Sequence, residues 1–424
     1  MNAPASNLAQ NTVEPAVAPI ARMQAFAIAG KVPARSAEAR SAERFIRARW
    51  AVSLLFLVYG LVFGTWAAMI PSLQDKFHLS AGQLSWVLLG MITGSMVSMP
   101  LTGKLIGYWG SGRLGGPAAP IFAATLLGIA FAPSYGASIA AAVFFGLSKG
   151  TLDVSINSQA ITVENAVKRP IMGGFQGCWS LGGMVASTTL SALMHHGFSP
   201  RPLMIGMAIG LAAVASLALG KLLPDTVTPL SSESQTASRR GSLFWLGGLL
   251  FLGLFCEGVM FDWSAVYARV IGGMSLASAP MGFAVFALCM ASGRFLGDFI
   301  VAKMGTVKVL RLSGLLLAVG IGLSILARPW PLILTGFALV GLGTANVVPT
   351  LFGVAGRLKG HRAGASLATV ATMGYFGFLA GAPTIGFIAS WFGLPKAFAL
   401  VIGAGIVIAT MGVAIVRGIG RSDQ

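Results

Sequence analysis

Hydrophobic positions in this chain form long, predominantly apolar runs of about 20 residues each, the length of a membrane-crossing helix. Short links with glycine, proline and charged residues separate the runs. A helix of that length crosses the ~30 Å hydrocarbon layer of a bilayer. The pattern therefore predicts an all-α integral membrane protein with twelve transmembrane helices. The runs are residues 50–70, 82–103, 115–132, 137–160, 170–194, 203–223, 243–267, 280–300, 308–327, 331–353, 364–391 and 397–417.

Two stretches outside the runs define the predicted domains. Residues 1–47 hold no membrane-length apolar run and no signal-peptide core, which predicts a disordered cytoplasmic tail. An organelle transit peptide and a true start at Met23 are the alternatives for this stretch. The longest link, 224–241, is rich in Ser and Thr and divides six runs from six. The domains we expect are an N-terminal six-helix bundle at 48–223, a cytoplasmic linker at 224–241, a C-terminal six-helix bundle at 242–418 and a cytoplasmic tail at 419–424.

The two predicted bundles share sequence motifs. Gly64–Ala68 matches Phe261–Ala265 around a tryptophan, and Gly146–Thr151 matches Gly341–Asn346 at nearly the same separation. An internally duplicated membrane protein is the usual plan of a secondary transporter, with the substrate site between the halves at mid-membrane. The repeat therefore predicts two six-helix halves around a central cavity.

Charge supports the membrane assignment and predicts the orientation. Hydrophobic residues make up 55% of the chain and charged residues only 10%, although the formal net charge is +17. Most Lys and Arg lie in the links on the side shared by both termini, for example Arg113 and Arg240. The positive-inside rule then places both termini in the cytoplasm. Anionic lipid at that surface accounts for the positive charge, so no nucleic-acid partner is expected.

The links and repeats resemble those of the major facilitator superfamily. Gly103–Arg113 keeps the glycines of that family's helix 2–3 loop but has Gly107 where the family usually has Asp, and Gly293–Asp298 is the second-half copy. Gly150–Ala160 and Glu257–Tyr267 are similar to the fucose-permease-like branch of bacterial inner-membrane permeases. The resemblance implies a multi-pass protein of the bacterial cytoplasmic (inner) membrane. It also implies the gating candidates Gly103, Gly107, Gly110 and Arg113, with Arg294 and Asp298 in the second-half copy.

Charged residues inside the runs are the strongest candidates for function, because a charge at mid-membrane costs about 2.5–3.5 kcal/mol on insertion scales. Lys149, Asp153 and Asn157 lie four residues apart, on one face of a helix. They are interpreted as a polar stripe facing the cavity, with Asp153 able to exchange a proton. The alternative is an intrahelical Lys149–Asp153 pair that neutralises itself.

The second half carries three further acidic candidates. Glu257 has no basic residue one helical turn away, so desolvation favours its neutral form and predicts a proton-coupling role shared with Asp153. A neutral Glu257 bonded to a neighbouring helix is the alternative. Asp262 is expected to cap or gate the outer end of its helix. Arg294 and Asp298 are four residues apart and predict a structural or gating ion pair.

Aromatic and amide side chains complete the predicted substrate site, with membrane packing as the alternative for each aromatic residue. The substrate-binding candidates are Tyr59, Trp66, Lys149, Asp153, Asn157, Gln176, Trp263, Asn346 and Tyr375. Neither a metal-ligand pattern nor a hydrolase or nucleotide-binding motif occurs in the sequence, so neither a cofactor nor an enzyme activity is expected.

The sequence as a whole predicts a monomeric, proton-coupled carrier of a small polar solute, either sugar-like or an organic metabolite. It would work by alternating access in the lipid bilayer. An exporter of metabolites or drugs by proton antiport is the first alternative. A membrane-embedded sensor or scaffold with the transporter fold is the second, and it would not need Asp153 or Glu257.

Overall fold

The computed structural model describes residues 37–167, 171–224, 240–327, 329–356 and 363–416, and this part of the chain is helical, with short turns between the helices. Its helices are α2 (Ala37–Phe77), α3 (Ala81–Trp109), α4 (Ser111–Phe131), α5 (Tyr135–Val167), α6 (Met172–His195), α7 (Pro200–Ser216), α8 (Arg240–Val270), α9 (Met281–Phe295), α10 (Gly297–Met304), α11 (Thr306–Leu326), α12 (Trp330–Ala345), α13 (Val347–Gly356), α14 (Ala363–Phe392), α15 (Leu394–Val407) and the π-helical turn η3 (Ile408–Gly412).

Nine helices in the described ranges are long and apolar enough to cross a membrane, and α7 and α9 are shorter apolar helices. The all-α membrane architecture predicted from the sequence is therefore confirmed, whereas the number of twelve spans stays a prediction. Residues 1–36 of the predicted tail lie outside the described residues. The tail prediction is wrong for residues 37–47, because α2 already begins at Ala37.

Two predicted spans are each built from two helices. The run 280–300 forms α9 and α10 with a break at Leu296, and the run 331–353 forms α12 and α13 with a break at Asn346. The Asn346 side-chain amide donates to the Gly293 carbonyl oxygen at 3.2 Å, so the two breaks contact each other. This bond links α12 to the end of α9 where both helices lose regular backbone bonding.

Local sequence signals explain several helix ends. Ser80 and Gln83 form a reciprocal capping box that starts α3. Gly110 ends α3 and starts α4 with φ 81°, and Gly305 separates α10 from α11 with φ 78°. A positive φ of this size favours glycine, so each half makes its tight turn with a glycine at the matching place.

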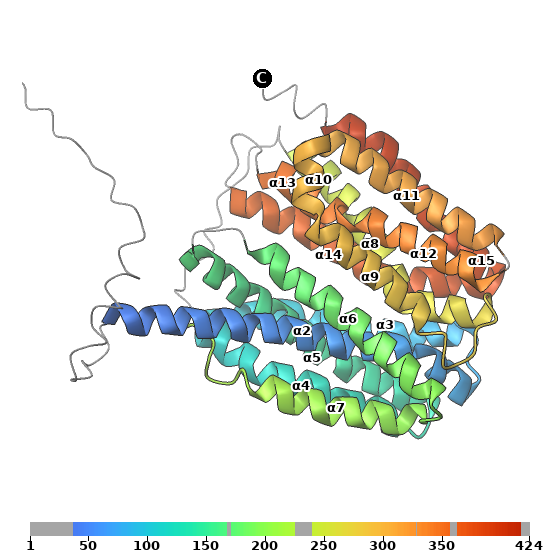
Figure 1. Cartoon of the computed structure of the whole chain (residues 1–424), viewed down its shortest axis with the longest axis horizontal. Helices are drawn as coiled ribbons and strands as arrows, with labels where there is room; N and C mark the ends of the chain where they lie inside the picture. Colours follow the sequence, from blue (N-terminus) through green and yellow to red (C-terminus); the bar gives the residue numbers. More distant parts are fainter. Residues whose placement is uncertain (1–36, 168–170, 225–239, 328, 357–362, 417–424) are drawn as a thin grey trace, which may run out of the picture. The chain divides into compact units, whose positions relative to one another are not determined.

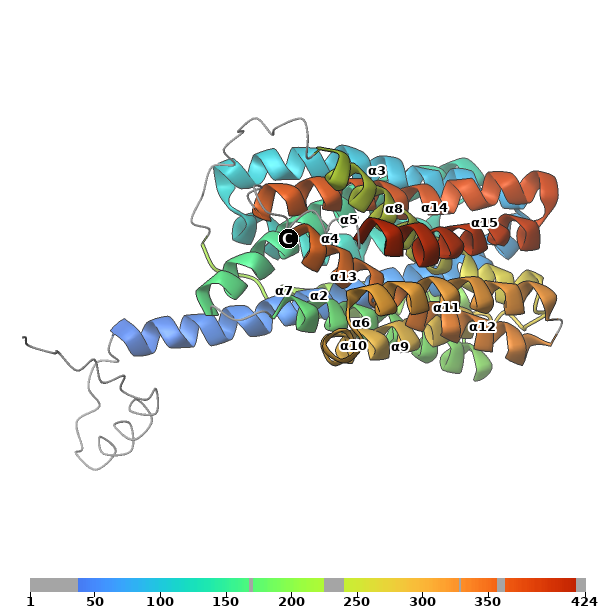
Figure 2. The same cartoon turned by 90° about the horizontal axis from the view of Figure 1, so that it is seen from above.

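The described residues from Phe45 onward form one compact unit. Its helices run lengthwise beside one another, as Figures 1 and 2 show. One end, called the terminal end, is where α3 ends and α6 and α8 begin. The opposite end, called the far end, carries the turns 78–80, 132–134, 196–199, 271–280 and residue 393.

Glycines let helices within each half approach to backbone contact, and they do so at matching places. Gly60 on α2 and Gly258 on α8 face α6 and α14, while Gly146 on α5 and its counterpart Gly341 on α12 face α3 and α9. Small residues at such contacts are the usual packing device of membrane helices. A Cβ atom would overlap the neighbouring carbonyl at each position: Gly60 with Trp179, Gly258 with Phe378, Gly146 with Met91 and Gly341 with Phe286.

The contacts between helices α2–α7 and helices α8–η3 include those of α3 with α14 and of α6 with α9. At the far end the first pair is in close contact, because Ser85 of α3 fills the space beside Gly386 of α14. The rings of Trp86 and Phe387 stack edge to face in the same region, with centroids 5.4 Å apart. The far end of the α3–α14 seam is therefore tightly packed.

Polar contacts also join the two groups of helices at the far end. Ser191 of α6 donates to the Ala277 carbonyl oxygen at 2.7 Å, and the His195 ring contacts the Ser278 hydroxyl at 2.9 Å. Arg269 at the end of α8 forms an ion pair with Asp75 at the end of α2, at 3.1 Å. These contacts tie the two groups of helices together at the far end, and we refer to them as the far-end contacts.

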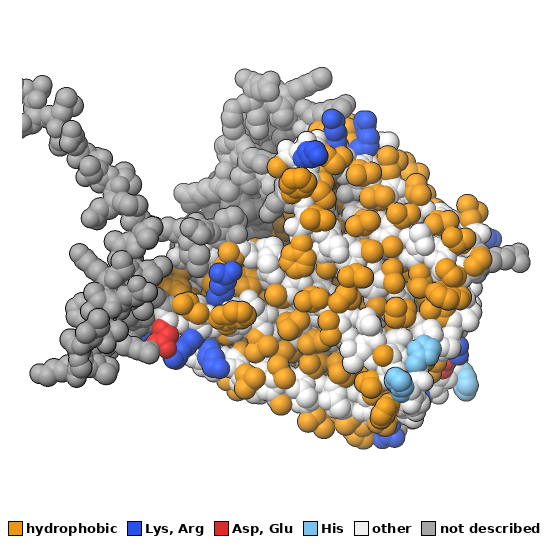
Figure 3. Space-filling view, viewed as in Figure 1, with side chains coloured by type: hydrophobic (Ala, Val, Ile, Leu, Met, Phe, Trp, Pro, Cys, Tyr) orange, Lys and Arg blue, Asp and Glu red, His pale blue; other side chains and the backbone are white. Residues whose placement is uncertain are grey.

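The outer surface fits a membrane environment. On the face shown in Figure 3, hydrophobic side chains cover the sides of the helices, whereas Lys, Arg and His side chains gather near the ends. Exposed hydrophobic residues such as Phe144, Ile209, Phe299 and Val319 expose more than half of their area. An apolar surface of this extent matches contact with lipid better than contact with water.

Candidate functional site

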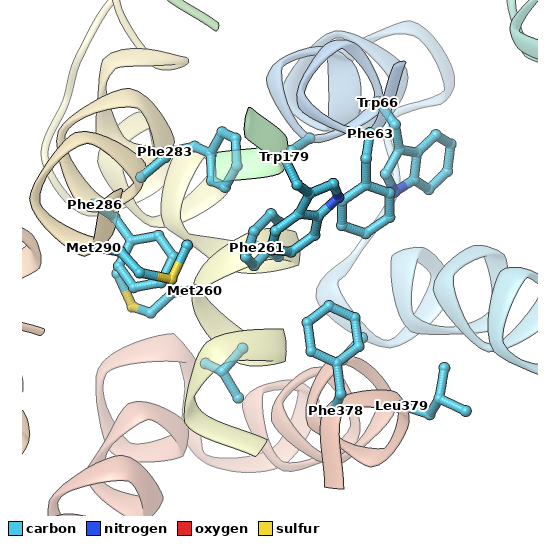
Figure 4. Packing of buried hydrophobic residues seen from close by; sticks show 14 of the residues in the cluster. Phe63, Trp66, Trp179, Met260, Phe261, Phe283, Phe286, Met290, Phe378 and Leu379 are labelled. Carbon is cyan, nitrogen blue, oxygen red and sulfur yellow. The ribbon is translucent and has the colours of Figure 1, made fainter. Parts of the chain in front are cut away.

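Aromatic side chains from four helices meet where the two groups of helices come together (Figure 4). Trp179 of α6 stacks on Phe261 of α8 with ring centroids 4.9 Å apart. Phe63 of α2 lies 5.3 Å from Phe261 and 6.3 Å from Phe378 of α14. Phe63, Trp179, Phe261 and Phe378 form an aromatic cluster, called the apolar floor, to which both halves contribute. The buried charged residues lie beside this cluster.

Lys149 on α5 is a buried cation at this floor, with 3% of its surface exposed. Its Nζ lies 5.5 Å from the centre of the Phe63 ring and 5.6 Å from that of Phe378, so rings from both halves hold the ammonium group. Asp153 and Asp262 are its charged neighbours. The ion pairs between described residues involve other groups, so the predicted Lys149–Asp153 pair is not a direct contact.

Asp153 is the start of a polar chain that joins α5 to α6. Its Oδ1 accepts a hydrogen bond from the Asn157 amide at 2.8 Å. The Gln176 amide donates in turn to Asn157 Oδ1 at 3.4 Å. Tyr59 and Tyr375 both lie within electrostatic range of the Asp153 carboxyl group. The structure thus brings five of the predicted substrate-binding residues into one neighbourhood.

Glu257 has a strong basic partner, which corrects the prediction that it is unpaired. Arg294 Nη2 donates to both Glu257 carboxylate oxygens, at 3.0 and 2.9 Å. The side chains of Glu257 and Arg294 are 3% and 11% exposed, so this is a buried ion pair. Helical spacing could not reveal this pair, because α8 and α9 contribute one residue each, 37 positions apart.

Arg294 also joins the two groups of helices. Its Nη1 donates to the Ser180 hydroxyl of α6 at 3.0 Å, and its guanidinium group lies 5.9 Å from the centre of the Trp179 ring. Ser180 was not a predicted site residue. The predicted partner Asp298 has a side chain outside the described residues, and the described partners of Arg294 lie on α6 and α8.

Asp262 lies beside Lys149, although the sequence predicted a cap or gate at the outer helix end. Its side chain is buried, and Oδ1 has no hydrogen-bond partner among the described residues. The indole N–H of Trp66, on α2, is likewise unpartnered within the described part of the chain and faces Asp262. Asp262 and Trp66 therefore form a polar pair across the contact between the halves, without a close hydrogen bond.

Two predicted substrate-binding residues serve the packing of the second half. Trp263 is fully buried, and its indole N–H donates to the Ala382 carbonyl oxygen at 3.0 Å. Asn346 uses its amide at the helix breaks described above. Both side chains direct a hydrogen bond at the backbone of a neighbouring helix, so this conformation does not support the interpretation of either as a substrate-binding residue.

The predicted gating loop is open at its start, whereas its end packs within the first half, where the Gln159 amide donates to the Ser111 hydroxyl at 2.7 Å. A Cβ atom at Gly103 or Gly107 would meet no atom within 4 Å, and Arg113 is exposed. Gly110 makes the turn from α3 to α4. Gly103 and Gly107 are therefore not packed against the second half in this conformation, and the gating role implied by the resemblance stays a prediction.

One polar side chain near the buried charges is accessible. Tyr375 on α14 is 37% exposed even though Asp153 and Glu257 are its electrostatic neighbours. Asn157 and Gln176 are half-buried. These hydroxyl and amide groups are therefore more accessible than the side chains of Lys149, Asp153 and Glu257. A separate hollow between α2 and α6 is lined by Arg49, Ser53, Ile171, Gly174, Phe175 and Cys178.

Sequence comparison identifies the family. Residues 52–301 match the sequence profile of the Major Facilitator Superfamily. The chain belongs to this superfamily. An uncharacterized MFS-type transporter of Yersinia pestis is 36% identical over 82% of this chain and 90% of its own length. The membrane protein MosC of Rhizobium meliloti is 30% identical over 85% of this chain and 88% of its own length.

Solved structures support the same fold. A point mutant of the nucleoside transporter NupG superimposes with a TM-score of 0.69 over 88% of this chain and 99% of its own. The two chains are 14% identical, so the likeness concerns the fold alone. As a superfamily member this chain is a multi-pass membrane transporter. The resemblance to the fucose-permease-like branch stays an expectation from the sequence.

Proposed function

We propose that this chain is a secondary active transporter that couples the movement of a small polar solute to protons by alternating access. The observation that carries the proposal is a cluster of buried charges to which both halves contribute. Lys149 and Asp153 come from the first half, while Glu257, Asp262 and Arg294 come from the second. Buried charges in a membrane protein are costly and usually mark the path of a substrate or ion.

The pairing within the cluster favours one carboxyl group for coupling. Glu257 is matched by Arg294, whereas Asp153 and Asp262 share the single ammonium group of Lys149. Binding of a proton to Asp262 would remove its attraction for Lys149 and so weaken one link between the halves. Such a step changes the balance between two conformations, as coupling requires. We therefore propose that Asp262 is the proton-coupling group, acting with Lys149 and Asp153. Glu257, which the sequence suggested for this role, is replaced by Asp262.

Orientation and conformation follow from two observations. The excess of Lys and Arg in the links at the terminal end supports a cytoplasmic location for that end in a bacterial inner membrane. The far-end contacts hold the opposite side closed. Under this orientation the side that these contacts close is the periplasmic side. A reporter fused after Gln424 that is active only in the periplasm would contradict the orientation.

Proteoliposomes test the coupling. A pH gradient across vesicles that contain the purified protein should drive solute accumulation, and collapse of the gradient by a protonophore should stop it. Asp262→Asn should keep solute exchange but lose the response to the gradient. Asp423→Asn, which removes the same charge near the C-terminus, is the matched control and should behave like the unmodified protein. Gradient-driven accumulation by Asp262→Asn would exclude Asp262 as the coupling group.

A further inference from the structure

The positive charges in the central cluster are already committed to carboxyl groups. Arg294 directs one terminal nitrogen at both oxygens of Glu257 and the other at Ser180. Lys149 has two acidic neighbours, Asp153 and Asp262. Two cations therefore face three carboxyl groups, so the cluster carries one excess negative charge when all of them are ionised and none when one carboxyl is protonated.

This balance leaves no positive charge in the cluster for an anionic ligand. A carboxylate or phosphate group entering the site would have to displace Glu257 from Arg294, or compete with two carboxyl groups for Lys149. Either route leaves a buried protein carboxylate unpaired, which is strongly unfavourable away from water. An uncharged solute avoids that cost because it leaves the charges of the cluster in place.

The accessible side chains suit an uncharged solute. Gln176 presents an amide from α6 that makes a 3.4 Å contact with Asn157 Oδ1, and Tyr375 presents a phenol ring and hydroxyl from α14. Asn157 of α5 is half-buried, and its NH2 group already donates to the carbonyl and carboxylate oxygens of Asp153, so a solute would share that amide with Asp153. Amides and hydroxyls donate and accept hydrogen bonds, as the hydroxyl groups of a solute also do. The exposed ring adds an apolar face against which a cyclic compound can stack.

We infer that the transported solute is an uncharged, hydroxyl-bearing ring compound, bound by Asn157 and Gln176 on one side and by Tyr375 on the other. The inference rests on the proposed function and deepens it. It excludes sugar acids, sugar phosphates and nucleotides, while cyclic polyols, neutral sugars and nucleosides remain within the class.

Matched pairs of neutral and anionic compounds test directly whether the site accepts only uncharged solutes. The thermal stability of the purified protein would be measured with a panel of cyclic polyols, neutral sugars and nucleosides. Each compound would be paired with its carboxylated or phosphorylated counterpart at the same concentration. A ligand that binds only the folded protein raises the unfolding temperature. We expect a shift from at least one neutral compound and none from its anionic counterpart. Stabilisation by an anionic member, or by no neutral member, would overturn the inference.

Variants test the binding residues once a neutral compound is found. Gln176→Leu and Asn157→Leu remove one amide each and should weaken that compound's binding by about tenfold, which corresponds to one well-placed hydrogen bond. Thr93→Val is the control, because the Thr93 hydroxyl bonds within its own helix, to the Leu89 carbonyl oxygen. Unchanged affinity in both leucine variants would contradict the placement of the solute.

The same measurements separate this inference from the proposed function. Binding of a neutral compound without proton-driven uptake would contradict proton coupling and leave the inference intact. Proton-driven uptake of an anionic compound would support coupling and contradict the inference.

Discussion

The ion pair between Glu257 and Arg294 makes a sharp prediction about stability. Glu257→Gln removes a negative charge from a pair whose side chains are 3% and 11% exposed. Removal of one partner from a buried pair costs about 3–5 kcal/mol, mainly because the other charge is left uncompensated. Glutamine keeps one oxygen that can accept from Arg294, so we expect a loss near the lower limit, about 3 kcal/mol.

The measurement is the thermal unfolding midpoint of the purified protein in detergent, with Asp262→Asn as the matched carboxyl-to-amide variant. Asp262 Oδ1 has no hydrogen-bond partner among the described residues, and Asp262 forms no direct ion pair in that part of the chain. The Asp262→Asn protein should therefore fold about as stably as the parent protein. We expect Glu257→Gln to unfold well below Asp262→Asn. The double variant Glu257→Gln/Arg294→Gln should recover part of the loss, because it leaves no unpaired charge.

Two results would refute this reasoning. Equal unfolding midpoints for Glu257→Gln and the parent protein would show that the pair contributes nothing to stability. A pattern in which Glu257→Gln folds normally but loses only its response to a pH gradient would return the coupling role to Glu257. In that case the Arg294 contact would be one conformation of a proton switch rather than a fixed structural pair.

Three further predictions concern packing and conformation. Gly60→Val should abolish recovery of folded protein in detergent, measured by size-exclusion chromatography, because its Cβ would overlap the α6 backbone, whereas Gly103→Ala should be neutral since its Cβ meets open space. Asp75→Asn should change stability by less than ~1 kcal/mol, as its pair with Arg269 is partly exposed. It should nevertheless increase labelling of cysteines introduced at the far end. Gly107→Leu should allow membrane insertion but block transport in vesicles, if the loop must approach the second half during the cycle; normal transport would show that the loop stays free.

The sequence predicted the helices well because each one is recorded locally as a run of apolar residues of membrane length. The break at Leu296 was missed for the same reason, since the apolar run continues through it without a proline. The Asn346 break did have a local signal that was overlooked, because Pro349 has no N–H to bond to the carbonyl oxygen of Ala345. The sequence did not show that the Asn346 amide at this break would donate to the Gly293 carbonyl oxygen on a different helix. A contact between helices leaves no trace in the local hydrophobic pattern.

In the candidate site, too, the sequence predicted the local features but not the contacts between helices. Intramembrane charge identified Lys149, Asp153 and Glu257 as residues that need a polar partner, and all three are buried near the contact between the halves. Pairing by helical spacing predicted Lys149 with Asp153 and left Glu257 alone. The structure pairs Glu257 with Arg294 instead, because tertiary packing decides which helices face each other. Sequence spacing reports neighbours on one helix only.

The two tryptophans at matching positions of the repeat have different surroundings in the two halves. Trp66 and Trp263 occupy matching positions in the two halves and are both buried. Trp263 donates its indole N–H to Ala382 within its own half, so it contributes to packing whatever the other half does. Trp66 directs the same group at Asp262 of the other half, without a close bond. Matching glycines give both halves the same backbone framework, but only Trp66 of the two faces a carboxyl group that the proposed proton step would change. A transporter built by duplication needs such a difference, because two halves with identical contacts would offer no group whose protonation favours one conformation over the other.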